Sequence, residues 1–256
     1  MSKLLVNRDG AVTTITFNQP ERKNAVDREM TLALRTAIEE AEQDDSRVVV
    51  LTGAGSDFCA GADLKAGTAE MHDVTEYLRS VTNPTVLAMR RMAKPLIAKV
   101  RGIAVGIGCN YALACDLRIA SPDARFGQIF ARIGLMPDGG STYFLPRMIG
   151  YARAFEWMVT AELYDAQKCF DMGIVNQVVS AEQLDAAVAA MAARLASGPA
   201  VAFAGIKRAL NVGESGSLAD ALDAEAVHQG HCFWSEDFKE GVRAFVEKRK
   251  PNYQGR

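Results

Sequence analysis

The stretch GIAVGIGCNYALACD, from Gly102 to Asp116, decides the fold. It follows an apolar run over 95–100, PLIAKV, that is short enough to be a buried strand, and it leads into YALA, which is typical of a buried helix. Gly102, Gly106 and Gly108 allow the connecting backbone to turn sharply and to approach a ligand closely. The helix directs its unpaired amide groups and the positive end of its dipole at the same place. The stretch therefore predicts a glycine-rich loop that either holds an electron-rich ligand or serves tight packing alone.

A second stretch has the same organisation. VVVLT, over 48–52, indicates another buried strand, and GAGSDFCAGADL follows it over 53–64. Two strands that each lead into a loop of small residues could bring main-chain N–H groups together. Such a pair of donors is an oxyanion hole, which stabilises negative charge on a carbonyl oxygen. The second loop therefore favours a ligand site over packing alone.

The composition is that of an ordinary globular protein. The chain has 256 residues, of which 49% are hydrophobic and 23% charged, and its formal net charge is −2. It is long enough for one well-filled core. The near-neutral charge argues against a nucleic-acid-binding surface, and no stretch approaches the roughly 20 apolar residues that span a membrane. We expect a cytoplasmic protein with no nucleic-acid or membrane partner.

The cysteines and histidines do not form a metal-binding pattern. The five cysteines are scattered among small apolar neighbours, which suits reduced thiols in a protein core. His228 and His231 could lie on one helix face, but no set of Cys and carboxylate ligands accompanies them. We expect no metal ion, and the GxGxxG and P-loop patterns of nucleotide-binding folds are absent.

Strands and helices are mixed in the first half of the chain. Strands are expected over 4–9, 11–17, 117–120 and 124–126. Asp27 can cap a helix that begins beside it, residues 65–75 indicate a variable loop, and a helix over 76–92 should be interrupted or delayed at Pro84. Apart from a strand over 174–179, helices alone follow, over 151–160, 165–172, 182–196, 201–211, 218–233 and 235–248. The pattern predicts an α/β fold with a helical C-terminal part.

Four motifs together resemble those of the crotonase family, the enoyl-CoA hydratases and isomerases. They are FCAGADL, GIAVGIGCNYALACD, FGQIFARIGLMPDGGST and the C-terminal AFVEKRKPNY, in the order and spacing of that family. The resemblance runs from about Val12 to the C-terminus. It implies a crotonase-like spiral of repeated β-β-α units over 1–195 and a helical region over 196–256 that mediates trimer contacts. A homotrimer or a hexamer of two trimers is therefore expected.

The resemblance implies an acyl-CoA thioester as the substrate and no cofactor beyond its coenzyme A moiety. The positions implied to contact coenzyme A, mainly through the backbone, are Ala25, Ala60, Asp63 and Leu64. Lys23 is implied to lie near a phosphate, with a solvated loop charge as the alternative. Phe245 and Lys248 match family residues that reach the nucleotide of a neighbouring subunit, and an amphipathic terminal helix with a solvated basic end is the alternative for both.

The motif positions assign the oxyanion-hole donors to the backbone amides of Ala62 and Ile107. Hydratases of the family use two glutamates, and here those positions hold Asn110 and Phe130, neither of which takes up a proton. Ordinary hydratase activity should therefore be weak or absent. The side-chain amide of Asn110 could orient the substrate or a water, or it could be a satisfied polar group at a helix start.

Asp138, in MPDGGST, stands where isomerases of the family carry their single acidic residue. One carboxylate suffices for a 1,3-proton shift, because the same group can remove a proton from one carbon and return it at another while the oxyanion hole holds the enolate. Apolar neighbours such as Leu135 should raise the pKa of Asp138 by desolvation. The alternative is a structural Asp138 that caps the helix expected from Ser141 or forms an Asx turn.

The leading hypothesis is an acyl-CoA isomerase that shifts a double bond or isomerises a ring-derived acyl-CoA. The wording of the motifs resembles the branch that isomerises ring-derived acyl-CoAs in phenylacetate breakdown, and the related Δ3,Δ2-enoyl-CoA isomerases. One alternative is a hydratase that uses another carboxylate, such as Asp63 or a residue of the loop over 65–75. The other alternative is a homologue that binds acyl-CoA without catalysis.

Overall fold

The computed structural model describes residues 2–64 and 73–256. The variable loop expected over 65–75 falls mostly on residues 65–72, outside the described part of the chain. Within the described part, the strands form two sheets. The larger sheet has the order β1-β2-β3-β4-β6-β9, with bounds Leu4–Asp9, Val12–Phe17, Val48–Gly53, Leu96–Val100, Leu117–Ala120 and Gln177–Val178. The smaller has the order β5-β7-β8, with bounds Ile103–Val105, Arg125–Gly127 and Leu163–Asp165.

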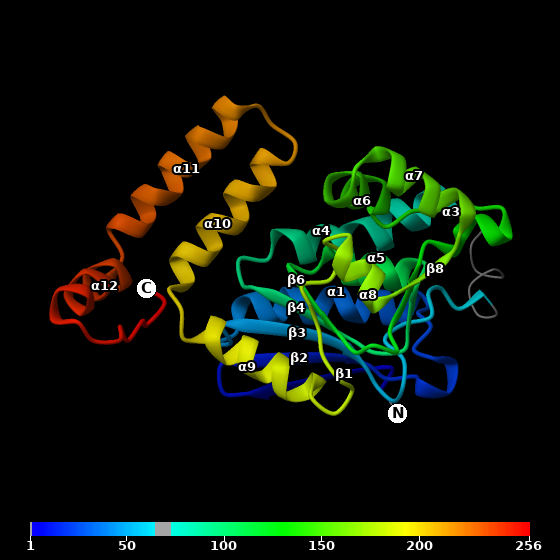
Figure 1. Cartoon of the computed structure of the whole chain (residues 1–256), viewed down its shortest axis with the longest axis horizontal. Helices are drawn as coiled ribbons and strands as arrows, with labels where there is room; N and C mark the ends of the chain where they lie inside the picture. The colour runs from blue at the N-terminus through cyan, green and yellow to red at the C-terminus, as the bar shows by residue number, and fades with distance from the viewer. Residues whose placement is uncertain (1, 65–72) are drawn as a thin grey trace.

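The helices that surround the sheets are α1, α3, α4, α5 and α6, with bounds Arg28–Gln43, Val74–Tyr77, Asn83–Arg91, Ile107–Ala114 and Ser141–Ile149. They continue with α7, α8 and α9, over Tyr151–Thr160, Ala166–Asp171 and Leu184–Ala196. The last three, α10, α11 and α12, span Ala200–Gly213, Leu218–Phe233 and Glu236–Glu247. Figure 1 shows these three extending away from the sheets, as a part of the chain distinct from the strands.

The central strand β3 of the larger sheet is buried on both faces, as expected for a continuous apolar run. β1 pairs with β2 in an antiparallel hairpin, and the other pairs of this sheet are parallel. Side chains alternate between the faces of a strand. In β3, Val48 and Val50 therefore pack with α9 on one face, while Val49 and Leu51 belong to the main core on the other, together with residues of α1 and α5.

From β4 to β7, successive strands alternate between the two sheets, which produces the repeated β-β-α unit expected from the sequence. β4 lies in the larger sheet, β5 in the smaller, and α5 follows; β6 and β7 then repeat the step. An isolated parallel bridge between Cys59 and Ala104 places the earlier glycine loop beside β5. The loop after β3 and the loop between β4 and α5 occupy the same position in two consecutive turns of the spiral. The two glycine loops are therefore neighbours.

Three local predictions differ from the structure. The strand expected over 174–179 is limited to the two residues of β9. The helix expected over 76–92 begins earlier, as α3, and then passes through a wider π-helical turn over Leu78–Thr82 before α4. Pro84 lies in the first turn of α4, directly after the π-helical turn. The segment that follows β7, for which no helix was expected, contains a 3-10 helix, Ile129–Ile133.

The C-terminal helices expose many large apolar side chains. α10 and α11 pack along each other, and Lys207 of α10 bonds Asp116 of the main body, yet much apolar surface of both helices stays exposed. The exposed apolar residues of α10, α11 and α12 include Ile206, Leu210, Leu222, Phe233, Phe245 and Val246. Among the described helices, none is by itself long and apolar enough to cross a membrane; α9 and α10 pass such a test only as a pair, bent by 102°. The division of the chain at residue 196 stays a prediction.

Candidate active site

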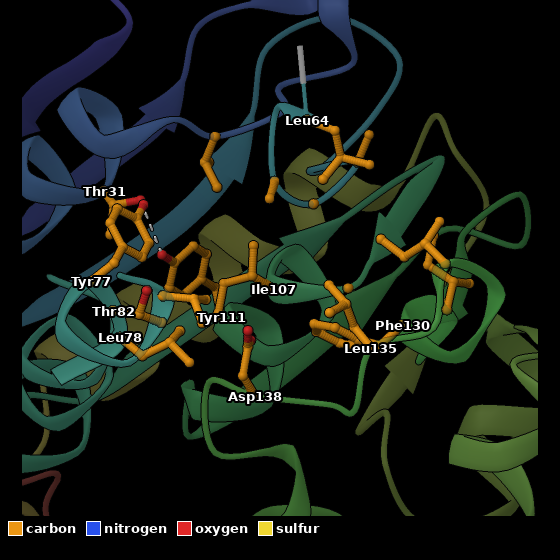
Figure 2. A pocket seen from close by; sticks show the side chains of 18 of the residues that line it. Thr31, Leu64, Tyr77, Leu78, Thr82, Ile107, Tyr111, Phe130, Leu135 and Asp138 are labelled. Atoms are coloured by element: carbon orange, nitrogen blue, oxygen red, sulfur yellow. Dashed lines mark hydrogen bonds between the residues drawn. The ribbon is translucent and has the colours of Figure 1, made fainter. Parts of the chain in front are cut away.

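A cavity of about 310 Å³ lies where the two glycine loops meet. Its walls come from α1, from the loop that follows β3, from α3 and its π-helical turn, from the start of α5 and from the segment over 129–138. Most of the lining is apolar: Val26, Leu64, Val74, Leu78, Ile107, Ile129, Phe130, Ile133 and Leu135. The acidic side chain among the lining residues is Asp138, and Figure 2 shows its carboxyl group directed into the cavity near Ile107.

The two loops touch through glycines that no other residue could replace without strain. Cys59 N–H donates to the Ile103 carbonyl at 2.8 Å, which aligns the loops. Gly61 and Gly106 both have positive φ, 92° and 56°. A Cβ built on Gly106 would lie 3.7 Å from the Cα of Gly61. The residues that directly follow these glycines, Ala62 and Ile107, are therefore brought together.

The backbone amides of Ala62 and Ile107 are available to a ligand. Val26 N–H donates to the Gly61 carbonyl, and Asp63 N–H donates to the Val26 carbonyl. In such a bridge the intervening N–H, that of Ala62, points away from Val26. Ile107 is the first residue of α5, where an N–H has no partner within the helix. Among the described residues, neither amide donates to another protein group.

The carboxyl group of Asp138 faces the cavity, while its main chain is firmly held. The Asp138 carbonyl accepts from Asn110 Nδ2 at 2.8 Å and from Ser141 Oγ at 3.1 Å. In contrast, Asp138 Oδ1 is buried and has no hydrogen-bond partner in the described part of the chain. The α6 helix begins after Gly140 with no side-chain cap. The structural alternative in which Asp138 caps this helix is therefore wrong.

Desolvation raises the pKa of Asp138 from its usual 3.8 to about 6, and its own backbone amide opposes this only in part. The expected apolar neighbours Leu135, Ile133 and Phe130 line the same cavity. A carboxyl group with this pKa is ionised at neutral pH and still gives up and takes back a proton readily, which suits acid–base work.

This pKa predicts a pH-dependent gain of stability in Asp138→Asn. Because the folded state raises the pKa, it holds the proton more tightly than the unfolded state, so the ionised group destabilises the fold above pH 6 and has no such effect below about pH 4. A two-unit shift in a partly exposed group corresponds to about 1–3 kcal/mol. We expect the variant to gain that much relative to the parent between pH 4 and pH 7.5, measured by urea unfolding. An equal difference at both pH values would contradict this.

Asn110 lies behind Asp138 and outside the cavity lining. It is fully buried, and its Oδ1 accepts from Gln128 Nε2 at 2.8 Å while its Nδ2 holds the Asp138 carbonyl. Both ends of the side-chain amide are therefore engaged by protein. Of the two expectations for Asn110, this arrangement supports a residue that positions the Asp138 loop over one that contacts the substrate. Sequence reasoning assigned Gln128 no such role.

The comparisons with known proteins agree with this geometry. The sequence profile of the family described as enoyl-CoA hydratase/isomerase matches residues 7–256. A probable enoyl-CoA hydratase from Rhodobacter capsulatus is 42% identical over 245 residues, which cover 96% of this chain and 95% of the relative. The chain belongs to the enoyl-CoA hydratase/isomerase family.

Similar proteins in this family include some that are named isomerases and others that are named hydratases. A 1,2-epoxyphenylacetyl-CoA isomerase from Escherichia coli is 36% identical over 261 residues and covers all of both chains. The crystal structure of an enoyl-CoA hydratase from Bacillus anthracis superposes with a TM-score of 0.94 at 32% identity, covering 100% of each chain. The enoyl-CoA hydratase/isomerase fold, with its mixed α/β spiral, is therefore confirmed for this chain.

Phe130 presents an apolar ring at the position expected to hold a hydratase glutamate. It is buried and lines the cavity. A Cβ built on Gly106 would lie 3.9 Å from the Phe130 ring, so the ring packs close to the loop that carries the Ile107 amide. This wall of the cavity therefore offers a substrate apolar contact and no proton acceptor.

The residues expected at coenzyme A lie at one end of the cavity and on the surface beside it. Ala60 and Leu64 line the cavity. The exposed Lys23 and the partly buried Ala25 lie in the loop before α1, and Ala60 N–H donates to the Lys23 carbonyl at 2.9 Å. The Asp63 carboxylate pairs with Arg22 and is not part of the cavity lining. Coenzyme A contacts of these residues stay predictions.

Phe245 and Lys248 lie on and just after α12, outside the cavity lining of their own chain. Phe245 is 85% exposed. This position is compatible with the expectation that both residues reach the nucleotide of a neighbouring subunit, which also stays a prediction. Among residues 2–64 and 73–256, no three His, Cys, Asp or Glu side chains gather as metal ligands.

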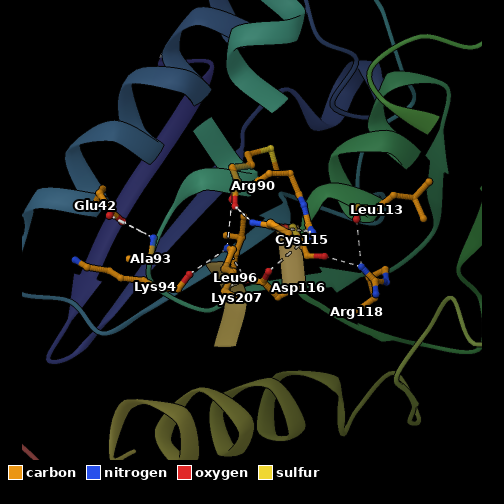
Figure 3. Close-up of polar contacts among 12 residues, drawn as sticks. Glu42, Arg90, Ala93, Lys94, Leu96, Leu113, Cys115, Asp116, Arg118 and Lys207 are labelled. Atoms are coloured by element: carbon orange, nitrogen blue, oxygen red, sulfur yellow. Dashed lines mark hydrogen bonds and ion pairs between the residues drawn. The ribbon is translucent and has the colours of Figure 1, made fainter. Parts of the chain in front are cut away.

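The end of α5 opposite the oxyanion hole is fixed by two buried cations. Figure 3 shows Arg118 and Lys207 at this end. The guanidinium of Arg118 donates to the carbonyls of Ala112, Leu113, Cys115 and Ile174. Lys207, on α10, donates to Asp116 Oδ2 at 2.7 Å and to the carbonyls of Met89 and Lys94 at 3.3 Å. Cations at a helix C-terminus stabilise it through the helix dipole.

Lys207→Met is expected to lower the free energy of unfolding by about 3 kcal/mol, because breaking a buried ion pair leaves one partner without its counter-charge. Lys207 is 8% exposed, and among the described residues Asp116 would keep only Leu96 N–H and the more distant Arg90. Urea unfolding measures the change. Lys239→Met is the matched control, since it pairs with Glu236 on the surface and should cost under about 1 kcal/mol. If the two variants lost the same free energy of unfolding, Lys207 and Asp116 would not act as a stabilising buried ion pair.

Proposed function

We propose that this chain is an acyl-CoA isomerase, which shifts a double bond or isomerises a ring-derived acyl-CoA through an enolate. The observation that carries the proposal is the Asp138 carboxyl group, directed into an apolar cavity without a partner on Oδ1. The same cavity is lined by Ala62 and Ile107, whose amides donate to no described protein group. One base and one oxyanion hole are what a 1,3-proton shift requires.

The proposed reaction moves one proton and changes no oxidation state. The thioester oxygen accepts hydrogen bonds from the amides of Ala62 and Ile107, which makes the adjacent C–H bond more acidic. Asp138 takes the proton from C2, and the electron pair of that bond becomes the enolate, conjugated with the C3–C4 double bond. The protonated Asp138 then returns the proton at C4, so that the double bond ends between C2 and C3 and the carboxylate is restored.

A hydratase is the second candidate, because several relatives carry that name. Addition of water needs a group that activates the water, and in the described part of the cavity Asp138 stands alone as a carboxylate. Asn110 and Phe130 replace the two glutamates, and Asp63, the alternative carboxylate, is engaged by Arg22. These observations favour isomerisation over hydration.

The test is a product assay with wild-type protein on three substrates: a straight-chain 3-enoyl-CoA, a 1,2-epoxyphenylacetyl-CoA and crotonyl-CoA. We expect a 2-enoyl or rearranged ring product from one of the first two, and slow or no formation of 3-hydroxybutyryl-CoA from the third. Fast hydration of crotonyl-CoA without isomerisation would establish the hydratase. Binding of acyl-CoA with no turnover of any substrate would establish a non-catalytic homologue.

Two further parts of the proposal concern assembly and location. We propose that the uncovered apolar faces of α10, α11 and α12 form a homotrimer, alone or paired as a hexamer, and that the protein acts in the cytoplasm. Light scattering of the purified chain measures the assembly. A monomer at micromolar concentration would contradict it.

A further inference from the structure

One side of the cavity carries hydroxyl groups, although most of its lining is apolar. Thr31, Tyr77, Thr82 and Tyr111 come from α1, α3, the π-helical turn and α5. Figure 2 shows Thr31, Tyr77 and Tyr111 together on one side, with Phe130 and Leu135 on the other and Asp138 between them. The 1,3-proton shift uses none of these hydroxyl groups, so their presence in the cavity calls for a separate explanation.

The hydrogen-bond directions distinguish Tyr77 from its neighbours. Thr31 Oγ1 donates its single proton to the Asp27 carbonyl at 2.9 Å, so toward the tyrosines it can only accept. Tyr111 is fully buried, and its hydroxyl is directed at Thr31 Oγ1 at 3.5 Å. Tyr77 lies beside Thr31 on the same side of the cavity and is only partly buried. A Tyr77 hydroxyl that donates to Thr31 keeps its oxygen lone pairs for the cavity.

Asp138 lies within electrostatic reach of this group of hydroxyls. The negative charge of Asp138 contributes to the raised pKa of both Tyr77 and Tyr111, after the larger effect of burial. Asp138 and Tyr77 line the same cavity, so an acyl chain that passes Asp138 also meets the side of the cavity that carries Tyr77. Phe130 and Leu135 on the opposite wall offer only apolar contact.

We propose that Tyr77 is a specificity-determining residue that accepts a hydrogen bond from a hydroxyl group on the acyl part of the substrate. The site would thus prefer hydroxylated acyl-CoA thioesters over plain hydrocarbon ones of the same length. The inference rests on the proposed function only in that the acyl group occupies this cavity. An apolar cavity discriminates weakly by size alone, whereas a placed hydrogen-bonding group discriminates strongly.

The test uses saturated ligands, which bind without reacting. Hexanoyl-CoA is compared with its 4-, 5- and 6-hydroxy derivatives by titration calorimetry. We expect wild-type protein to bind at least one hydroxy derivative about five- to tenfold more tightly than hexanoyl-CoA, the effect of one neutral hydrogen bond. Tyr77→Phe should abolish that preference and leave the affinity for hexanoyl-CoA within about twofold.

The matched control is Tyr143→Phe, on α6 and outside the cavity lining, which should leave both affinities unchanged. The inference is overturned if no hydroxy derivative is preferred by the wild type, or if Tyr77→Phe keeps the preference. It is also overturned if Tyr77→Phe weakens hydroxylated and plain ligands equally, which would indicate a packing role of the ring. Because the measurement needs no turnover, it stays separate from the isomerase assay, whose failure would leave this binding result intact.

Discussion

Asp138→Asn is expected to lower kcat for double-bond isomerisation by about 10²–10⁴-fold, the usual contribution of a positioned general base. The amide is nearly the same size as the carboxyl group but cannot take up the proton. The loop should keep its position, since it is held through the Asp138 carbonyl by Asn110 and Ser141. The Kd for an acyl-CoA, measured by titration calorimetry, should therefore change by less than about twofold, because the oxyanion hole remains.

The pH profile of the wild type offers a second check on the same residue. Since burial raises the pKa of Asp138 to about 6, kcat/KM should increase as the pH rises through about 6 and then level off, because the free carboxylate is the reactive form. Asp45→Asn is a suitable control, as its side chain is 93% exposed. Full activity of Asp138→Asn would remove Asp138 from the mechanism.

Ile107→Pro should lower kcat by about 10²–10³-fold, the cost of one lost oxyanion-hole donor. Proline has no N–H, and Ile107 is the first residue of α5, the helix position that accepts proline best. The preceding residue, Gly106, is a glycine and tolerates the backbone conformation that proline requires. This substitution therefore removes the donor with little change to the helix.

Ile107→Ala is the matched control, because it keeps the N–H and removes most of the side chain. The Ile107 side chain packs against the Pro-Asp-Gly-Gly turn, where a Cβ built on Gly139 would lie 2.3 Å from Ile107 Cδ1. We expect Ile107→Ala to lose stability but to keep kcat within about tenfold of wild type. If both variants lost the same activity, packing of the side chain and not the amide would explain the effect. Circular dichroism verifies that both variants fold.

The sequence predicted those parts of the fold that depend on local patterns. The helix cap at Asp27 and the helix over 218–233 were indicated by short-range signals and are confirmed. The buried helix expected at YALA is confirmed too, but it begins earlier, at Ile107. β5 was not recognised, because its three residues lie within a glycine-rich stretch. β9 was predicted too long, since most of the apolar run before it packs in the core without pairing.

The lone carboxylate and the two glycine loops of the site could be found from motifs, since each sits in a distinctive short segment. The role of Asn110 could not, because its two partners, Gln128 and the Asp138 carbonyl, are 18 and 28 residues away in the chain. Tyr77 was missed for a similar reason. A single tyrosine after a variable loop gives no signal until the fold places it beside Thr31.

The way in which Asp138 is held has a consequence for how one side chain could serve two carbon atoms. Its main chain is anchored by Asn110 and Ser141, while its Oδ1 is tied to no described residue. The carboxyl group can therefore rotate about the side-chain bonds while the main chain of Asp138 stays in place. Delivery of a proton to a second carbon would then need only rotation about the side-chain bonds, with no shift of the surrounding backbone and no release of the bound enolate.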